Sequence, residues 1–139
     1  MNITLVPVAE IDNLWPSVSP MLLKCWETAP GYLSLGEFWQ MCRSGTAFVL
    51  VAHDEKAIVG TSIWQFQRGY GQDVFSCLVL AGENAKTWLK PMFDVAAKMA
   101  KNGGATSISA TGRLQWQAMF DKHLPDVFKP VRQSYLAEV

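Results

Sequence analysis

Apolar positions at the start of this 139-residue chain alternate between strand-like and helical spacing. The run ITLVPV is apolar and β-branched, and Pro7 within it favours an edge strand. The stretch DNLWPSVSPMLLKCWETAPG then has apolar patches at helical spacing, with Asp12 as the expected N-cap. Because proline lacks a backbone donor, Pro16 and Pro20 are expected to split or kink this helix.

A second, short helix and a meander of three strands follow. In SLGEFWQMCRSG, Ser34 and Glu37 have the spacing of a capping box, and Gly45 is the expected stop. The period then changes to that of strands in three apolar runs separated by the short links DEK and RGYGQD. These runs are AFVLVAH, AIVGTSIWQF and VFSCLVL. Three consecutive strands with short links predict an antiparallel arrangement.

The last third of the sequence predicts two more helices and two more strands. A long helix is expected from Thr87 as N-cap to NGG at 102–104, because this start places Pro91 in the first turn, where no intrahelical N–H is lost. ATSISA is a predicted strand, and Pro125 ends an amphipathic helix within 110–125 whose apolar positions are Trp116, Met119, Phe120 and Leu124. VFKPVRQSYLAEV is a predicted final strand, broken by Pro130.

The element order predicts one α+β domain over residues 1–139, with a twisted mixed sheet of about six strands and helices on both faces. Twelve basic and twelve acidic side chains cancel, so nucleic acid and anionic membranes are not expected partners. The three cysteines (Cys25, Cys42 and Cys77) are far apart among apolar neighbours, which favours buried thiols over a disulfide or metal site. A reducing, cytoplasmic location is therefore expected. The start of the chain has no basic region typical of a signal peptide, so an unprocessed, soluble protein is expected.

This order of elements, with a central hairpin and a long helix after the fourth strand, resembles the GNAT superfamily of acyl-CoA-dependent N-acyltransferases over nearly the whole chain. The stretch GRLQW at 112–116, ahead of MFDKHLP, also resembles divergent GNAT-like proteins encoded by tailed phages and prophages. The second resemblance implies a phage or prophage origin, and a location in the host cytoplasm or in the virion.

The resemblance also implies where an acyl-CoA would bind. In active members, a loop of the type Gln/Arg-x-x-Gly-x-Gly/Ala opens the long helix, and its backbone N–H groups hold the pyrophosphate. Here the loop is AGENAK at 81–86, with one glycine and an acidic Glu83 that opposes a phosphate. The late helix start makes this loop longer than its counterpart in the enzymes. The residues that the resemblance places against acetyl-CoA are Leu78, Leu80, Gly82, Lys86 and Arg113.

The catalytic groups of the family have no clear counterpart. Its helix motif Asn-x-x-Ala-x-x-x-Tyr carries a tyrosine that protonates the leaving thiolate, and Phe120 stands at that place, with Arg113 at the Asn place. Phenylalanine has no proton to give. The usual glutamate base on the fourth strand is also missing, so the remaining candidates are Asp73, Cys77 and His123.

The chain has six tryptophans in different elements, which is more than one small core can bury, so some are expected at the surface. Exposed aromatics on a neutral protein favour a protein partner or self-association over nucleic acid. Two functions remain open: a GNAT-like protein with degenerate motifs and a non-catalytic interaction or virion-associated role, which we favour, and an active acetyl-CoA-dependent N-acetyltransferase. Neither requires a metal.

Overall fold

A single five-stranded sheet is the centre of the computed structural model, in which residues 1–28, 31, 33–69, 71–112, 115–132 and 135–139 are described. The strands lie in sequence order, and the first three pairings are antiparallel while β4 and β5 are parallel. Their bounds are β1 Asn2–Leu5, β2 Phe48–His53, β3 Ile58–Gly69, β4 Gln72–Gly82 and β5 Ser107–Ala110. The predicted meander is confirmed, and the described strands number one fewer than the roughly six expected.

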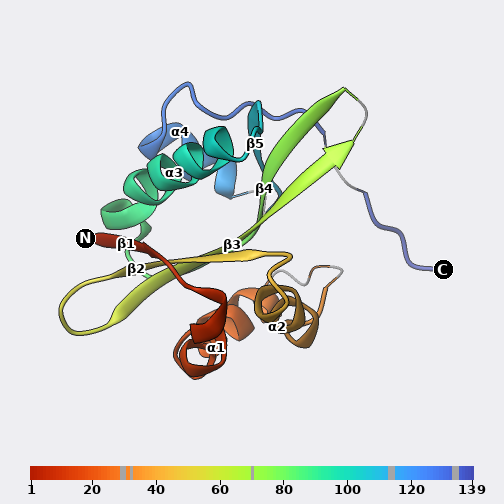
Figure 1. Ribbon diagram of the computed structural model, residues 1–139. Helices are drawn as coiled ribbons and strands as arrows, with labels where there is room; N and C mark the ends of the chain where they lie inside the picture. Colours follow the sequence, from red (N-terminus) through yellow and green to blue (C-terminus); the bar gives the residue numbers. More distant parts are fainter. Residues whose placement is uncertain (29–30, 32, 70, 113–114, 133–134) are drawn as a thin grey trace.

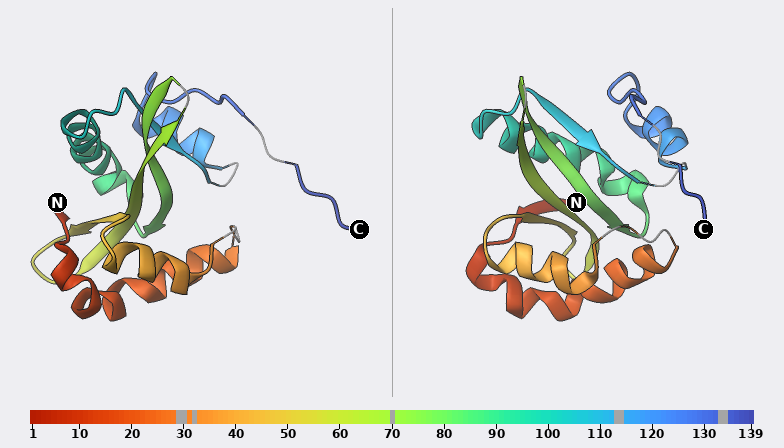
Figure 2. Two further views of the ribbon diagram at one scale, coloured as in Figure 1. Left: turned by 45° about the vertical axis from the view of Figure 1, so that its right-hand side comes forward. Right: turned by 90° about the vertical axis from the view of Figure 1, so that its right-hand side faces the viewer.

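Helices cover both faces of the sheet, as the sequence predicted (Figure 1). The helices α1 (Ile11–Thr28) and α2 (Leu35–Arg43) lie on one face, while α3 (Ala85–Asn102) and α4 (Trp116–His123) lie on the other (Figure 2). Side chains alternate along β2, so that Val49 packs with α1 and α2 whereas Leu50 packs with α3. Two apolar cores result, one on each side of the sheet.

The cap of α2 forms as the sequence predicted. The Ser34 hydroxyl accepts a hydrogen bond of 3.2 Å from the Glu37 backbone N–H. At α1 the predicted cap is wrong, because a short 3-10 turn over Val8–Glu10 precedes Ile11 and places Asp12 inside the first turn. There the Asp12 carboxylate accepts hydrogen bonds from Trp39 and Arg43 of α2. Asp12 therefore ties two helices together instead of capping one.

Prolines do not interrupt the helices where the sequence analysis expected them to. Pro16 and Pro20 lie within one continuous α1, and both are exposed. The carbonyl groups that each proline leaves without an intrahelical donor can therefore bond to water. Pro91 lies inside α3, which begins at Ala85 and not at Thr87. The buried face of α3, which includes Trp88 and Phe93, offsets the lost hydrogen bond.

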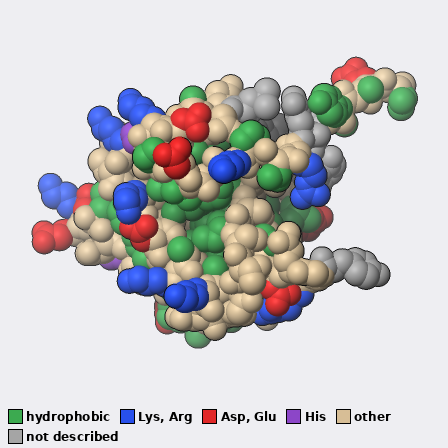
Figure 3. All heavy atoms as spheres, turned by 90° about the horizontal axis from the view of Figure 1, so that it is seen from above, with side chains coloured by type: hydrophobic (Ala, Val, Ile, Leu, Met, Phe, Trp, Pro, Cys, Tyr) green, Lys and Arg blue, Asp and Glu red, His purple; other side chains and the backbone are tan. Residues whose placement is uncertain are grey.

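Two other expectations about the strands are corrected. The stretch RGYGQD is not a separate link, because β3 runs to Gly69 and β4 starts at Gln72, which makes one long hairpin. The predicted final strand is not formed in residues 127–132 or 135–139, which carry no regular structure. The described C-terminal end projects from the body with several apolar side chains exposed (Figure 3).

Candidate functional site

A cleft opens where β4 and β5 separate. The two strands pair only from Val74 to Cys77 of β4, so the stretch Leu78–Gly82 continues without β5 beside it. The pairing of β4 with β3 also slips here, from Ile63↔Val79 to Trp64↔Cys77, which leaves Leu78 as the extra residue of a β-bulge. A bulge bends its strand and strengthens the local twist, and this bend carries the end of β4 away from β5.

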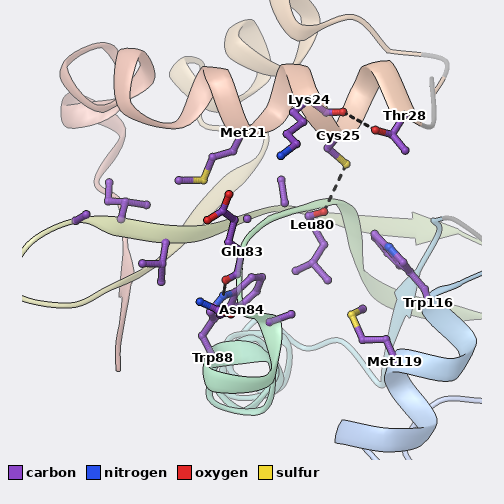
Figure 4. A pocket seen from close by; sticks show the side chains of 16 residues that line it. Met21, Lys24, Cys25, Thr28, Leu80, Glu83, Asn84, Trp88, Trp116 and Met119 are labelled. Carbon is purple, nitrogen blue, oxygen red and sulfur yellow. Dashed lines mark hydrogen bonds between the residues drawn. The ribbon is translucent and has the colours of Figure 1, made fainter.

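The cleft has a volume of about 560 Å³ and is bounded by three helices and the sheet (Figure 4). One side of α1 forms its roof, the turn from β4 into α3 forms its floor, and α4 closes one end. Most of its labelled side chains are apolar or sulfur-containing: Met21, Cys25, Leu80, Trp88, Trp116 and Met119. An apolar cleft with few polar groups is typical of small-molecule sites.

Two charged side chains enter this cleft from opposite walls. Lys24 points down from α1, and Glu83 points up from the β4–α3 turn (Figure 4). Within the described residues the ion pairs are Arg43–Asp12, Arg68–Asp73 and Lys90–Asp94, so neither Lys24 nor Glu83 takes part in one. The thiol of Cys25 donates a hydrogen bond of 3.5 Å to the Leu80 carbonyl, which joins α1 to the floor of the cleft.

Sequence reasoning missed the contribution of α1 to this site. Met21, Lys24, Cys25 and Thr28 have i, i+3, i+4, i+7 spacing and form one stripe. This stripe lies beside the core stripe that contains Val18 and Leu22. The spacing was visible in the sequence, but only the packing of α1 over β4 shows that the stripe faces a cavity.

The turn between β4 and α3 is short and closed by its own hydrogen bonds. Only Glu83 and Asn84 separate the two elements. The Glu83 N–H donates to the Val59 carbonyl at 3.0 Å, and the Trp88 indole N–H donates to the Glu83 carbonyl at 2.7 Å. The expected late start of the helix, with Thr87 as N-cap, is therefore wrong, because β4 extends to Gly82 and α3 begins at Ala85.

Gly82 has a packing role in this turn. Its φ angle is +137°, and a Cβ atom there would lie 2.4 Å from the Val59 carbonyl oxygen and 3.2 Å from the Trp88 ring. The conformation and the close approach both require glycine. The side of Gly82 that would carry a Cβ atom thus faces β3 and Trp88.

These contacts do not fit the diphosphate of an acyl-CoA. Only two residues separate β4 from α3, and the Glu83 amide already donates to the Val59 carbonyl. The Glu83 carboxylate also enters the cleft near the amino end of α3, where it repels an anion and itself interacts favourably with the helix dipole. The described residues therefore offer a cleft in which one amide of the expected phosphate loop is already bonded and a carboxylate opposes an anion.

The residues expected to contact a cofactor are only partly brought together. Leu80 and Gly82 line the cleft, whereas Leu78 and Lys86 are not among its lining residues. Lys86 is exposed on the first turn of α3. Arg113 lies outside the described residues.

The catalytic candidates lie away from the cleft. Asp73 accepts a 2.6 Å hydrogen bond from Arg68 in an ion pair, and it precedes Leu80 by seven strand residues, about 23 Å of extended chain. Cys77 is buried, and desolvation raises the pKa of its thiol, so it is neutral near pH 7. His123 is in the last turn of α4 and does not line the cleft.

Phe120, at the place of the family's tyrosine, belongs to the core. Its ring centroid lies 4.6 Å from that of Phe128 and 5.7 Å from that of Phe93. The residues of α4 that face the cleft are instead Trp116 and Met119 (Figure 4). No group on the described part of α4 that lines the cleft can donate a proton to a thiolate, apart from the Trp116 indole, which is not an acid.

Comparison with known structures identifies the architecture. A ribosomal-protein-alanine N-acetyltransferase from Brucella melitensis biovar Abortus 2308 matches with a TM-score of 0.70 at 14% identity, over 100% of both chains. An aminoglycoside acetyltransferase from an uncultured soil metagenomic sample, in complex with sisomicin, matches with a TM-score of 0.70 at 13% identity, over 99% of this chain and 96% of that one. The chain has the GNAT fold.

The sequence of this GNAT-fold protein matches no family model and no curated protein. A transcriptional regulator from Bacillus halodurans C-125 shares the fold as well, with a TM-score of 0.68 at 14% identity over 99% of each chain. At such identities the likeness shows the fold alone.

The described residues contain neither a candidate metal site nor a helix that could span a membrane. No group of three or more histidine, cysteine, aspartate or glutamate side chains there could hold a metal ion. No described helix is both long and apolar enough to cross a membrane.

Proposed function

We propose that this GNAT-fold protein does not catalyse acyl transfer and acts by binding another molecule. The observation that carries the proposal is the two-residue β4–α3 turn, whose Glu83 amide is bonded to Val59 and whose carboxylate enters the cleft. Acyl-CoA binding in this fold depends on free amides at that place. A turn whose Glu83 amide is already bonded has one donor fewer for a diphosphate, and the Glu83 carboxylate repels it.

The chemistry of the cleft supports the same proposal. A general acid must reach the leaving thiolate directly or through one water. Phe120 is in the core and Asp73 is paired with Arg68, so neither reaches the cleft. The titratable side chains that do line it are Lys24, Cys25 and Glu83, and none stands where the family's tyrosine stands.

The alternative function is an active acetyl-CoA-dependent N-acetyltransferase. The cleft of about 560 Å³ along the unpaired end of β4 favours it, as do two structural neighbours that are acetyltransferases. Such an enzyme would rely on positioning of the two substrates, with water as the proton carrier, because positioning alone supplies a large part of the rate. Leu80 and Gly82 would then contact the cofactor.

The origin and partners belong to this proposal as well. The resemblance of GRLQW to phage and prophage proteins supports a phage-encoded, virion-associated protein that works in the host cytoplasm or in the particle. Its partner would be a protein, including a second copy of this chain, and not nucleic acid. Genes for capsid, portal or tail proteins beside its own gene would support this origin. Neighbouring genes for enzymes of amine metabolism would contradict it.

A coenzyme-release assay tests the catalytic question. Purified protein is incubated with acetyl-CoA and a panel of amines that includes peptide amino termini, lysine peptides and aminoglycosides, and free thiol is measured over time. We expect thiol release at the rate of the protein-free blank. The matched variant Glu83→Gln should behave the same. Release that is proportional to protein concentration and depends on the amine would establish the alternative.

A further inference from the structure

The stretch Leu78–Gly82 of β4 is an open sheet edge inside the cleft. β5 pairs with β4 only from Val74 to Cys77, and no other described strand lies beside β4 on that side. Main-chain groups of successive residues in a strand point to alternate sides, so some N–H and C=O groups of this stretch point away from β3. The Leu80 carbonyl accepts a weak donor, the Cys25 thiol, at 3.5 Å. This edge can therefore accept a stronger main-chain partner.

The walls of the cleft continue the two faces of the sheet beyond this edge. Leu80 packs into the core beside α3, whereas Ala81 packs into the core beside α1 and α2. The side chains that form the walls are Met21, Lys24, Cys25 and Thr28 from α1, and Trp88, Trp116 and Met119 from α3 and α4 (Figure 4). The space of about 560 Å³ between these walls therefore has the shape that an added strand needs.

The two walls differ in chemistry, and a strand between them would contact both. Successive side chains of a strand point to opposite faces, so alternate side chains of the ligand would meet alternate walls. The wall from α3 and α4 is apolar and aromatic, which suits aliphatic side chains. The wall from α1 carries Lys24, which is exposed and takes part in none of the ion pairs of the described residues. This wall suits a carboxylate. The stretch Leu78–Gly82 spans about 16 Å of strand, enough for about four residues of an extended peptide.

We propose that the cleft binds an extended peptide segment of a partner protein, which adds as a strand to the open edge of β4. Its apolar side chains lie against Trp116 and Met119, and a carboxylate side chain lies at Lys24. Main-chain hydrogen bonds supply the affinity in this mode of recognition, and the alternate side chains supply the specificity. Glu83, at the end of the edge, opposes a second carboxylate there. The inference rests on the proposed function, because coenzyme in the same cleft would exclude the peptide.

NMR titration with a synthetic peptide tests the main-chain contact. The isotope-labelled full chain is titrated with acetyl-Val-Glu-Val-amide, whose blocked ends leave the glutamate as its charged group. We expect saturable shifts at the amides of Leu78–Gly82. The same peptide with every residue N-methylated lacks the main-chain donors and should bind at least about tenfold more weakly. Equal binding of the two peptides, or no saturable shift at millimolar peptide, would overturn the proposal.

A charge exchange tests the contact at Lys24. Lys24→Glu should weaken binding of acetyl-Val-Glu-Val-amide by about fivefold, and it should bind acetyl-Val-Lys-Val-amide better than the parent does. Lys98→Glu is the matched control, because Lys98 is exposed on α3 and does not line the cleft. The control should keep the preference of the parent for the glutamate peptide. A Lys24→Glu variant with that same preference would overturn the assignment of the carboxylate to this wall.

The peptide experiments and the coenzyme experiments fail separately. A chain that binds neither acetyl-CoA nor acetyl-Val-Glu-Val-amide would overturn this inference alone. A chain that releases thiol from acetyl-CoA in proportion to its concentration would overturn the proposed function by itself.

Discussion

The Trp88 indole donates a 2.7 Å hydrogen bond to the Glu83 carbonyl, and this contact closes the turn from β4 into α3. Trp88 is buried, and its ring also fills the space beside Gly60, where a Cβ would lie 2.5 Å from it. The strand end, the turn and the first turn of α3 are thereby held as one unit. The same unit occupies the place where the family resemblance puts the phosphate loop.

Replacing Trp88 tests how much this unit contributes to folding. Trp88→Phe removes the donor to Glu83 and part of a buried ring, and we expect the free energy of unfolding to fall by about 2–3 kcal/mol. Trp26→Phe is the matched control, since Trp26 is 37% exposed and also donates to a backbone carbonyl, that of Leu33. Urea unfolding of both variants should show the larger loss of unfolding free energy for Trp88→Phe. Equal losses in the two variants would mean that Trp88 does not hold the turn.

Gly82 is expected to resist substitution. In Gly82→Ala the new methyl group meets the Val59 carbonyl at 2.4 Å in a left-handed backbone conformation, and the combined strain should cost about 3 kcal/mol or more. Gly36→Ala, on α2, has its nearest contact at 3.8 Å and should be neutral or stabilising. Thermal unfolding compares the two. A mild Gly82→Ala variant would show that the turn can open, and would weaken the argument against a diphosphate site.

Restoring the family's tyrosine should not restore chemistry. Phe120→Tyr adds a hydroxyl within a cluster of aromatic rings, where burial without a partner costs about 1–3 kcal/mol. We expect lower stability and no release of coenzyme thiol. The comparison variant Met119→Leu, at a position that faces the cleft, should stay near the stability of the parent. Thiol release by Phe120→Tyr above the blank would contradict the placement of Phe120 in the core.

The buried thiols predict a loss of stability at alkaline pH. Burial raises the pKa of Cys42 from 9.0 to about 12 and raises that of Cys77 as well. Above the unfolded value the unfolded chain loses thiol protons that the native protein keeps, so the free energy of unfolding falls as pH rises from about 9 toward 12. In Cys42→Ala this fall should be shallower than in the parent, measured by urea unfolding at a series of pH values. Identical slopes would contradict burial of the Cys42 thiol.

Local signals in the sequence predicted most of the fold. The Ser34–Glu37 cap depends on four consecutive residues, and the meander depends on the apolar period of each strand, so both could be read directly. Prolines are a poor guide to the helix bounds here, because the buried face of α3 offsets the cost of Pro91. The final strand was predicted from pattern alone, yet a strand forms only where another strand accepts it.

The candidate site was harder to predict than the fold. Leu80 and Gly82 followed from the family resemblance, and both line the cleft. Lys24 and the closure of the turn by Trp88 depend on contacts between residues far apart in the sequence, which no local pattern contains. Asp73 is a candidate base in the sequence because its carboxylate lies near the fourth strand. In the structure it lies at the start of β4, far from the cleft, and pairs with Arg68.

Calorimetric titration with acetyl-CoA tests the central claim most directly. An intact cofactor site would give a saturable binding curve, and ligand at about a hundred times its Kd would stabilise the fold by roughly 2.7 kcal/mol. We predict no saturable heat and no shift of the melting temperature at millimolar acetyl-CoA, for the parent and for Glu83→Gln. Stoichiometric binding by the parent would contradict the account.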